Sequence, residues 1–116
     1  MEKRRRLREN ADFQRLRREG QTLVRPLIVL SFLPNDLGYT RFGFAIGKRI
    51  GKAVVRNRIK RRMREAVRTR IQEGKVAEGW DIVLIARRPI AEADFQQVDE
   101  TIGLLLRRAG LTREVS

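Results

Sequence analysis

The sequence contains no cysteine and no histidine, and both absences restrict the chemistry of the chain. Without cysteine there is no disulfide, no thiolate nucleophile and no thiolate-bound metal. Without histidine the chain lacks the commonest general base and the commonest ligand of transition metals. The 14 Asp and Glu residues are dispersed, whereas two-metal phosphodiester cleavage needs carboxylates gathered around the ions. We therefore expect the polypeptide alone to be catalytically inactive.

Long apolar segments are also missing. No run approaches the length of a membrane span. The basic start of the chain, residues 1–8, is not followed by the apolar stretch of a secretory signal. We therefore expect a soluble, cytoplasmic protein of one domain covering residues 1–116, with residues 1–9 as a flexible basic arm.

Negative charge is scarce relative to positive charge. The chain has 27 Lys and Arg against 14 Asp and Glu, which gives a net charge of +13. Its cations are 22 Arg and only five Lys. The guanidinium group binds phosphate through two hydrogen bonds and stacks on bases, so this bias favours nucleic acid as the partner, although genome composition also raises arginine content.

Hydrophobic periodicity predicts an α+β fold with the element order αββαβα, a two-layer sandwich. An apolar strand lies between Pro26 and Pro34, and an alternating strand, residues 39–46, is predicted to pair with it as a hairpin. The remaining elements are a short helix over residues 10–19, a long helix over 52–73, a central strand over 80–86 and a last helix over 93–109.

Two helices show clear apolar faces. In the long helix Val55, Ile59, Met63, Val67 and Ile71 recur every four residues, which places them on one side. The last helix is predicted to bury the following side chains: Phe95, Val98, Ile102, Leu105, Leu106 and Ala109. Among the aromatics, Phe42 and Phe44 are candidates for base stacking, but we expect at least one of them to be core.

The long helix is also strongly basic. Residues 52–70 contain nine basic residues and one acid, Glu65. Arg56, Lys60, Arg64 and Arg68 are four apart and line one side of the helix, while Arg58 and Arg61 add neighbouring sides. Such a rigid set of cations is suited to successive phosphates. A solvated cationic face is the alternative, but the near absence of acids leaves its self-repulsion unrelieved.

Two further features lie near the start of this helix. The loop at residues 47–51 contains Lys48 and Arg49 and precedes Lys52, which favours a phosphate contact, although a plain turn explains its glycines equally well. The amide of Asn57 can read a base edge or a 2′-hydroxyl, or it can brace a neighbouring loop. Small residues Gly43 and Ala45 share one strand face and predict a shallow groove beside Phe13.

Residues 47–65, with Arg-Asn-Arg at 56–58, Lys-Arg at 60–61 and Arg-Glu at 64–65, strongly resemble the signature of the bacterial ribonuclease P protein family. Arg6-Leu7 with Asp12-Phe13, and residues 81–87, extend the resemblance over almost the whole chain. The resemblance implies a left-handed βαβ crossover. It also implies a catalytic RNA partner that uses Mg²⁺, bound mainly through RNA, to remove the 5′ leader of precursor tRNA.

The resemblance further implies two sets of site residues. It implies no small-molecule substrate and no membrane partner, and no side chain that binds a metal or acts in catalysis. The set expected to contact the catalytic RNA is Lys48, Arg49, Lys52, Arg56, Asn57, Arg58, Lys60, Arg61, Arg64 and Arg68. The set expected in the leader cleft is Phe13, Arg17, Leu30, Ser31, Arg41 and Gly43. Relatives often have Tyr at the position of Leu30 or Ser31, and some relatives have an aromatic residue at the position of Arg17. Arg17 is therefore expected to hold a leader phosphate instead of stacking on a base.

Three other functions are compatible with parts of the pattern. A ribosomal assembly factor would use the same electrostatics and differ in the RNA it binds. A stand-alone nuclease would require cleavage by the RNA-free protein. A basic helix on a membrane surface is disfavoured because the apolar stripe lacks bulky exposed aromatics.

The stripe of the long helix generates a first prediction. Ile59→Asp is expected to unfold the domain, because it places a charge among apolar side chains that have no partner for it. Arg58→Ala, one residue away on the basic side, serves as the control and should leave the fold intact. Thermal unfolding followed by circular dichroism distinguishes the two, and a folded Ile59→Asp protein would contradict the predicted orientation of the helix.

Overall fold

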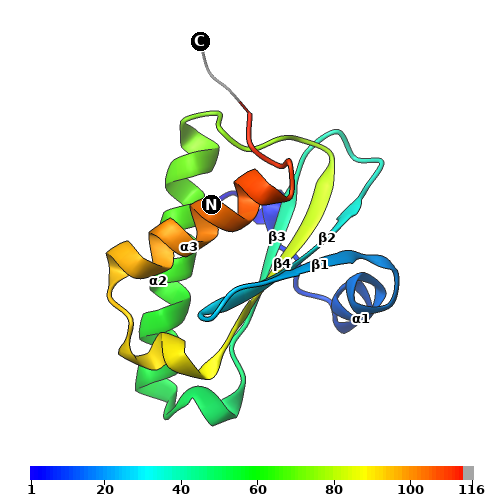
Figure 1. Ribbon diagram of the computed structural model, residues 1–116. Coiled ribbons are helices and arrows are strands. Elements are labelled where there is room, and N and C mark those ends of the chain that lie inside the picture. Colours follow the sequence, from blue (N-terminus) through cyan, green and yellow to red (C-terminus); the bar gives the residue numbers. More distant parts are fainter. Residues whose placement is uncertain (114–116) are drawn as a thin grey trace.

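The computed structural model describes residues 1–113 and confirms the α+β class (Figure 1). Three α-helices and a four-stranded mixed sheet form the fold, and short 3₁₀ turns (η1 to η3) join them. In chain order the elements are η1 (Lys3–Arg5), α1 (Asn10–Glu19), β1 (Gln21–Val24), β2 (Ile28–Pro34), β3 (Arg41–Ala45), η2 (Lys48–Ile50), α2 (Ala53–Gln72), β4 (Trp80–Ala86), η3 (Arg88–Glu92) and α3 (Phe95–Arg108).

The sheet has the strand order β1-β2-β4-β3, which corrects the predicted hairpin between β2 and β3. Strand β4 lies between them, antiparallel to β2 and parallel to β3. A parallel pair needs a long crossover, and α2 provides it. The left-handed sense of this crossover stays a prediction. Strand β1, a four-residue edge strand that pairs with β2, was not predicted.

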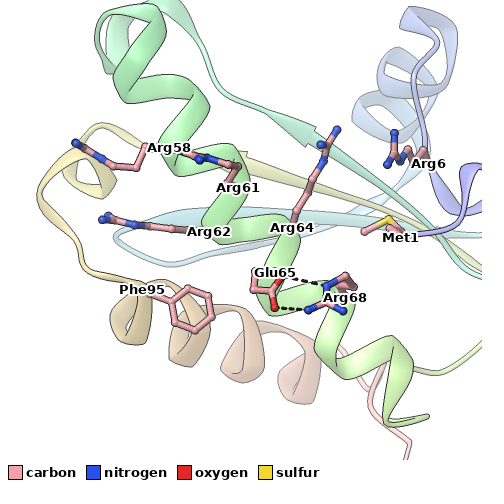
Figure 2. A pocket seen from close by; sticks show the side chains of 9 residues that line it. All are labelled: Met1, Arg6, Arg58, Arg61, Arg62, Arg64, Glu65, Arg68 and Phe95. Carbon is pink, nitrogen blue, oxygen red and sulfur yellow. Dashed lines mark hydrogen bonds and ion pairs between the residues drawn. The ribbon is translucent and has the colours of Figure 1, made fainter.

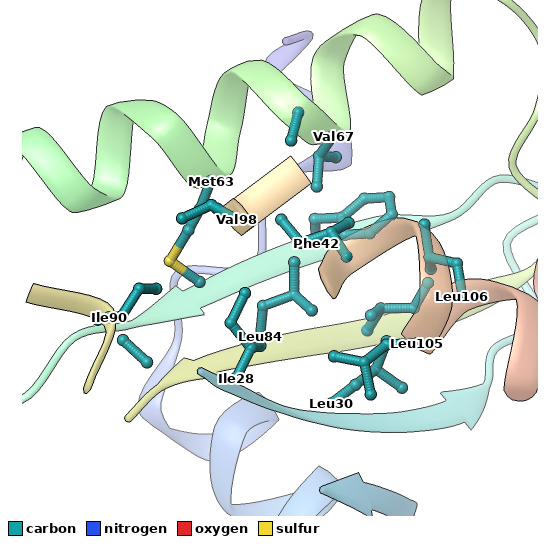
Figure 3. Packing of buried hydrophobic residues seen from close by; sticks show 14 of the residues in the cluster. Ile28, Leu30, Phe42, Met63, Val67, Leu84, Ile90, Val98, Leu105 and Leu106 are labelled. Atoms are coloured by element: carbon teal, nitrogen blue, oxygen red, sulfur yellow. The ribbon is translucent and has the colours of Figure 1, made fainter. Parts of the chain in front are cut away.

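The main core lies between the sheet and the helices α2 and α3 (Figure 3). Because side chains alternate along a strand, every second residue of β2, β3 and β4 enters this core. From α2 the buried side chains are Ile59, Met63, Ala66 and Val67, so the predicted stripe is confirmed. The strand residues that meet them are Ile28, Leu30, Phe32, Phe42, Ile82 and Leu84.

Helix α1 lies on the opposite face of the sheet (Figure 1). Leu16 is buried there against Val83, and Phe13 packs beside them. Two glycines permit this close approach. A Cβ at Gly43 would lie 2.8 Å from the Phe13 ring, and one at Gly20 would lie 2.9 Å from the carbonyl oxygen of Phe32.

Residues 5–7 of the N-terminal segment pack against the sheet, within the stretch 1–9 for which a flexible basic arm was predicted. Leu7 is buried, and its N–H donates to the Phe42 carbonyl at 2.8 Å. Arg5 is 8% exposed, and its two Nη atoms donate to the two carboxylate oxygens of Glu78 at 2.8 and 2.9 Å. This pairing was not predictable from local patterns because the partners lie 73 residues apart.

Helix α3 buries Val98, Ile102, Leu105 and Leu106 as predicted, but Phe95 is a correction. It is the first residue of the helix, and its side chain is 42% exposed. Within residues 1–113, no helix is long and apolar enough to cross a membrane.

The contact between Gly43 and Phe13 generates a second prediction. Gly43→Val is expected to lower the free energy of unfolding by about 1–3 kcal/mol, because the added carbons overlap the Phe13 ring and the side chain of Leu7. Gly47→Ala is the matched control, since nothing lies within 4 Å of its added Cβ. Chemical denaturation measures both, and equal stabilities would show that α1 moves away without cost.

Candidate nucleic-acid interface

The basic side of α2 faces away from the core, because the apolar stripe fixes the rotation of the helix. Asn57, Arg58 and Arg61 are exposed, while Arg56, Lys60 and Arg64 are half-buried. Arg68 forms a bidentate ion pair with Glu65, so its charge is partly neutralised. Arg62, by contrast, donates to the Ala93 carbonyl at 2.6 Å and links α2 to the loop before α3.

Arginines of α2 surround a hollow of about 580 Å³ (Figure 2). Arg58, Arg61, Arg62, Arg64, Glu65 and Arg68 come from α2, and the other three lining residues lie outside this helix. The lining residues that were not predicted to belong to this site are Met1, Arg6, Arg62, Glu65 and Phe95. Arg6 enters from the N-terminal segment, and Phe95 enters from the start of α3. The sequence hinted at Arg6 only through its basic surroundings, since its placement depends on the anchoring of Arg5 and Leu7.

A smaller hollow lies on the other side of Arg6 and Arg64. Its other lining residues include Arg8, Lys60 and the rings of Phe13 and Phe44. Phe42 is 1% exposed and belongs to the core, as expected for at least one of the two strand phenylalanines. The N-terminal segment thus extends the cationic surface of α2 towards α1.

The loop before α2 forms the turn η2 at one end of the sheet. Lys48 and Arg49 are exposed there, and with Ile85 and Arg88 they line another hollow. Lys52 is also exposed and precedes the first turn of α2. These cations therefore lie close to the free N–H groups of the helix, where an anion is favoured.

A cleft of about 220 Å³ separates α1 from the sheet. Phe13, Leu16 and Arg17 line it from α1, as predicted for Phe13 and Arg17. Ser31 lines it from β2, and its hydroxyl lies 3.1 Å from that of Thr22 on β1. Thr22 was not predicted, because β1 itself was not. The sheet side of the cleft also includes Val29, Ala45, Val83 and Ile85.

The other predicted cleft residues have different positions. Leu30 is fully buried in the core on the α2–α3 side, so its assignment to the cleft was wrong. Strand alternation decides this, since Ser31 and Leu30 point to opposite faces. Gly43 lies beneath the Phe13 ring. Arg41 shares the α1 face of β3 with Gly43, but its guanidinium is held by a carboxylate.

That carboxylate is Asp81, which is fully buried. It accepts hydrogen bonds from Arg41 Nε at 2.9 Å and Nη2 at 2.8 Å, from Asn35 Nδ2 at 2.8 Å and from Arg15 Nη2 at 2.5 Å. Burial raises the pKa of Asp81, but the hydrogen bonds from Arg41, Asn35 and Arg15 outweigh it and hold the pKa below its usual value. The Asp81 carboxylate on β4 thus links this strand to α1, to β3 and to the turn after β2.

Glu78 behaves in a similar way at the N-terminal segment. The hydrogen bonds from Arg5 are the main reason why the pKa of Glu78 lies below its usual value, and the Thr40 N–H adds a further hydrogen bond at 3.0 Å. Both carboxylates are thus engaged in holding the fold. Among residues 1–113, no group of three or more Asp or Glu side chains is placed to hold a metal ion.

Comparisons with known proteins agree with the resemblance over nearly the full chain. A family model described as Ribonuclease P matches residues 1–110. The ribonuclease P protein component of Roseiflexus castenholzii is 46% identical over 109 residues, which cover 93% of this chain and 88% of the relative. That of Pelotomaculum thermopropionicum is 43% identical, covering 92% and 94%.

Solved structures give the same result for the fold. The RNase P protein from Thermotoga maritima superposes with a TM-score of 0.80 at 36% identity, covering 89% of this chain and 96% of that one. The RNase P protein of Staphylococcus aureus superposes with a TM-score of 0.85 at 29% identity, covering 94% and 98%.

The buried carboxylate at position 81 generates a third prediction. Because the pKa of Asp81 is lower in the folded than in the unfolded protein, its stabilisation is complete above the unfolded pKa of about 3.9 and is lost as the pH falls through the folded pKa. Asp81→Asn should lower the free energy of unfolding at pH 7 by about 3 kcal/mol, the low end for a broken buried pair, since Arg15 and Arg41 are partly exposed.

Denaturation at pH 7 and at steps down to pH 2 checks this prediction. The variant should lose less stability than the parent between pH 4 and pH 2, because it has no carboxylate at this position to protonate. Glu100→Gln, at an exposed carboxylate, is the control and should follow the parent. Parallel curves for Asp81→Asn and the parent would contradict the assigned role of the buried ion pair.

Proposed function

Because this chain belongs to the ribonuclease P protein family, we propose that the two faces of its sheet bind two different RNAs. The chain is a protein subunit of ribonuclease P, the endoribonuclease that matures the 5′ end of tRNA. In this proposal the α2 side binds the catalytic RNA, and the cleft beneath α1 binds the 5′ leader of precursor tRNA. The observation on which it rests is that the arginine-lined hollow and the cleft lie on opposite faces of one sheet.

The α2 face suits a folded RNA because its cations are free and rigidly held. Within the described residues, Arg58, Arg61 and Arg64 form no salt bridge, and neither does Arg6 beside them. Because the buried apolar stripe holds α2 against the sheet, the helix loses little backbone entropy when it binds RNA. Its positive charges are therefore already arranged along the helix before phosphates bind. Asn57 is exposed on the same helix and offers an amide to a base edge or a 2′-hydroxyl.

The cleft beneath α1 suits a single strand. Its sheet side presents small or hydroxyl-bearing residues, such as Ala45 and Ser31, which leave room between the strands and the helix. Phe13 offers an aromatic ring at this site, and aromatic rings bind unpaired bases with little regard to sequence. Arg17 is exposed on α1 and is suited to hold a leader phosphate.

The two regions meet at one end of the sheet. Ile85 lines both the cleft and the hollow that contains Lys48 and Arg49. A strand that leaves the cleft at this end would therefore meet the cations that precede α2. This continuity supports a path on which the leader runs from the cleft towards the site where the catalytic RNA is bound.

The chemistry is assigned to the RNA subunit in this proposal. The residues present do not fit a protein-only Mg²⁺ site, because the best-ordered carboxylates, those of Asp81 and Glu78, are bound to arginines. Mg²⁺ would then be bound mainly through RNA, and the polypeptide would raise the affinity for substrate and for the ion. A cytoplasmic location, and the absence of a small-molecule substrate, remain predictions.

A cleavage assay on precursor tRNA at low Mg²⁺ tests the proposal. Protein alone, a bacterial ribonuclease P RNA alone and both together are compared. Cleavage that is strong only with both would support a cofactor subunit. Cleavage by the protein alone would place catalytic groups in the polypeptide, and no enhancement over the RNA alone would point to a different RNA partner, such as ribosomal RNA.

The assignment of the two faces generates a fourth prediction. Arg58→Ala should weaken binding of the RNA subunit and lower the slope of log Kd against log salt by about 0.7–0.9, the value for one lost phosphate contact. It should leave the affinity for a single-stranded leader unchanged. Arg17→Ala should do the reverse, since Arg17 lines the cleft on the other side of the sheet. Both side chains are exposed, so neither change should lower thermal stability.

Filter binding with the two RNAs separately measures these effects. Two variants that weaken both RNAs equally would show that the cationic surface acts as a whole and that the faces are not specialised.

A further inference from the structure

Phe95 is an exposed aromatic residue on a helix whose other large apolar residues are buried. Val98, Ile102 and Leu105 of α3 are fully buried, whereas the Phe95 side chain is 42% exposed. It lies instead at the edge of the arginine-lined hollow, with its ring projecting from α3 towards α2 (Figure 2). Phe95 lies outside the core cluster and instead forms part of the lining of a cationic hollow.

The position of Phe95 is firmly held by its neighbours. Asp94 precedes it and caps α3: its side chain accepts from the Gln97 N–H at 2.8 Å, and the Gln97 side chain accepts from the Asp94 N–H at 2.9 Å. On the other side, Arg62 of α2 donates to the Ala93 carbonyl at 2.6 Å. The ring is therefore presented by an ordered helix start that is tied to the basic helix.

The Phe95 ring has no aromatic or cation–π partner among residues 1–113. In the part of the chain that the structure describes, the one cation–π contact joins Arg4 to Tyr39, and the one aromatic pair joins Phe32 to Trp80. In the same hollow, Arg58, Arg61 and Arg64 have no carboxylate partner among the same residues. Glu65 also lines the hollow, but it is paired with Arg68. A partly exposed aromatic ring that lines the same hollow as unpaired cations matches a base flanked by phosphates.

We propose that Phe95 stacks on an unpaired base of the catalytic RNA while the surrounding arginines hold the adjoining phosphates. The inference rests on the proposed function and adds a specific contact on α3 to it. The catalytic RNA is favoured over the leader as the source of the base, because the leader cleft lies on the opposite face of the sheet. A second copy of this chain fits poorly, since each copy has a net charge of +13.

Three substitutions at Phe95 separate stacking from simple apolar contact. Phe95→Ala removes the ring, Phe95→Leu keeps apolar volume without a π face, and Phe95→Tyr keeps the π face. Binding of the RNA subunit is expected to weaken about 5-fold or more for Ala and for Leu, the range that stacking on one base implies, and to be nearly unchanged for Tyr. The slope of log Kd against log salt should stay that of the parent, because no phosphate contact is lost.

Val54→Ala is the matched control, since Val54 is an exposed apolar residue on α2 that does not line the hollow. It should bind the RNA subunit as the parent does. Thermal midpoints of all variants are measured, and they should match the parent because the Phe95 side chain lies outside the core cluster. Phe95→Trp gives a direct signal: its fluorescence should be quenched on RNA binding beyond the change that Trp80 shows in the parent.

The possible results distinguish this inference from the proposed function. If Phe95→Ala and Phe95→Leu bind the RNA subunit like the parent while Arg58→Ala binds it weakly, the stacking contact is refuted and the RNA-binding face stands. If Leu retains full affinity and only Ala loses it, the contact is apolar rather than stacking, which also overturns the inference. Loss of affinity for the leader alone would overturn it too, by placing the base in the substrate. If Arg58→Ala is also without effect, the proposed function itself fails.

Discussion

The burial of the apolar stripe of α2 against the sheet is the interaction on which the rest of the structure depends. Ile59, Met63, Ala66 and Val67 are at most 1% exposed. Each of the larger three contributes about 1.5–3 kcal/mol through burial, whereas like charges one helical turn apart cost only about 0.2–0.5 kcal/mol per pair. The hydrophobic contribution therefore outweighs the repulsion among the arginines. The helix can present a dense set of cations because its other side is so firmly packed.

The same sheet that buries this stripe creates a second, different surface on its other face. The alternation of side chains along β2 sends Leu30 into the core and Ser31 into the cleft beneath α1. Local patterns were sufficient to predict β2, β4, α2 and the face that α2 buries, because each depends on residues close in sequence. The pairing of the strands was not predictable in this way. It depends on α2 crossing the sheet to bring β4 between β2 and β3, which no local signal in residues 27–46 encodes.

The errors at the candidate site have the same origin. Residues 1–9 have the composition of a mobile arm, but within them Arg5 is bound to a carboxylate 73 residues away and Leu7 forms a backbone hydrogen bond to Phe42. Phe95 has the spacing of a core residue, one turn before Val98, yet it is the first residue of its helix. At that position the chain enters from the η3 side, and Phe95 lines the arginine-rich hollow instead of joining the core against the sheet. Periodicity cannot detect this, because it treats a helix end like a helix interior.

The placement of the few carboxylates determines which arginines remain available for RNA. Arg5, Arg15, Arg41 and Arg70 each meet a carboxylate from a distant part of the chain, namely Glu78, Asp81 or Asp99. These pairs join separate elements and contribute to the fold. On α2 the acid Glu65 neutralises Arg68, and within residues 1–113 Arg58, Arg61 and Arg64 have no acidic partner. In the sequence the two groups of arginines look alike, because the partners that distinguish them lie 29 to 73 residues away. The surface suited to a polyanion arises because few carboxylates lie near these arginines of α2. The carboxylates of Glu78, Asp81 and Asp99 lie elsewhere and stabilise the elements that hold this surface in place.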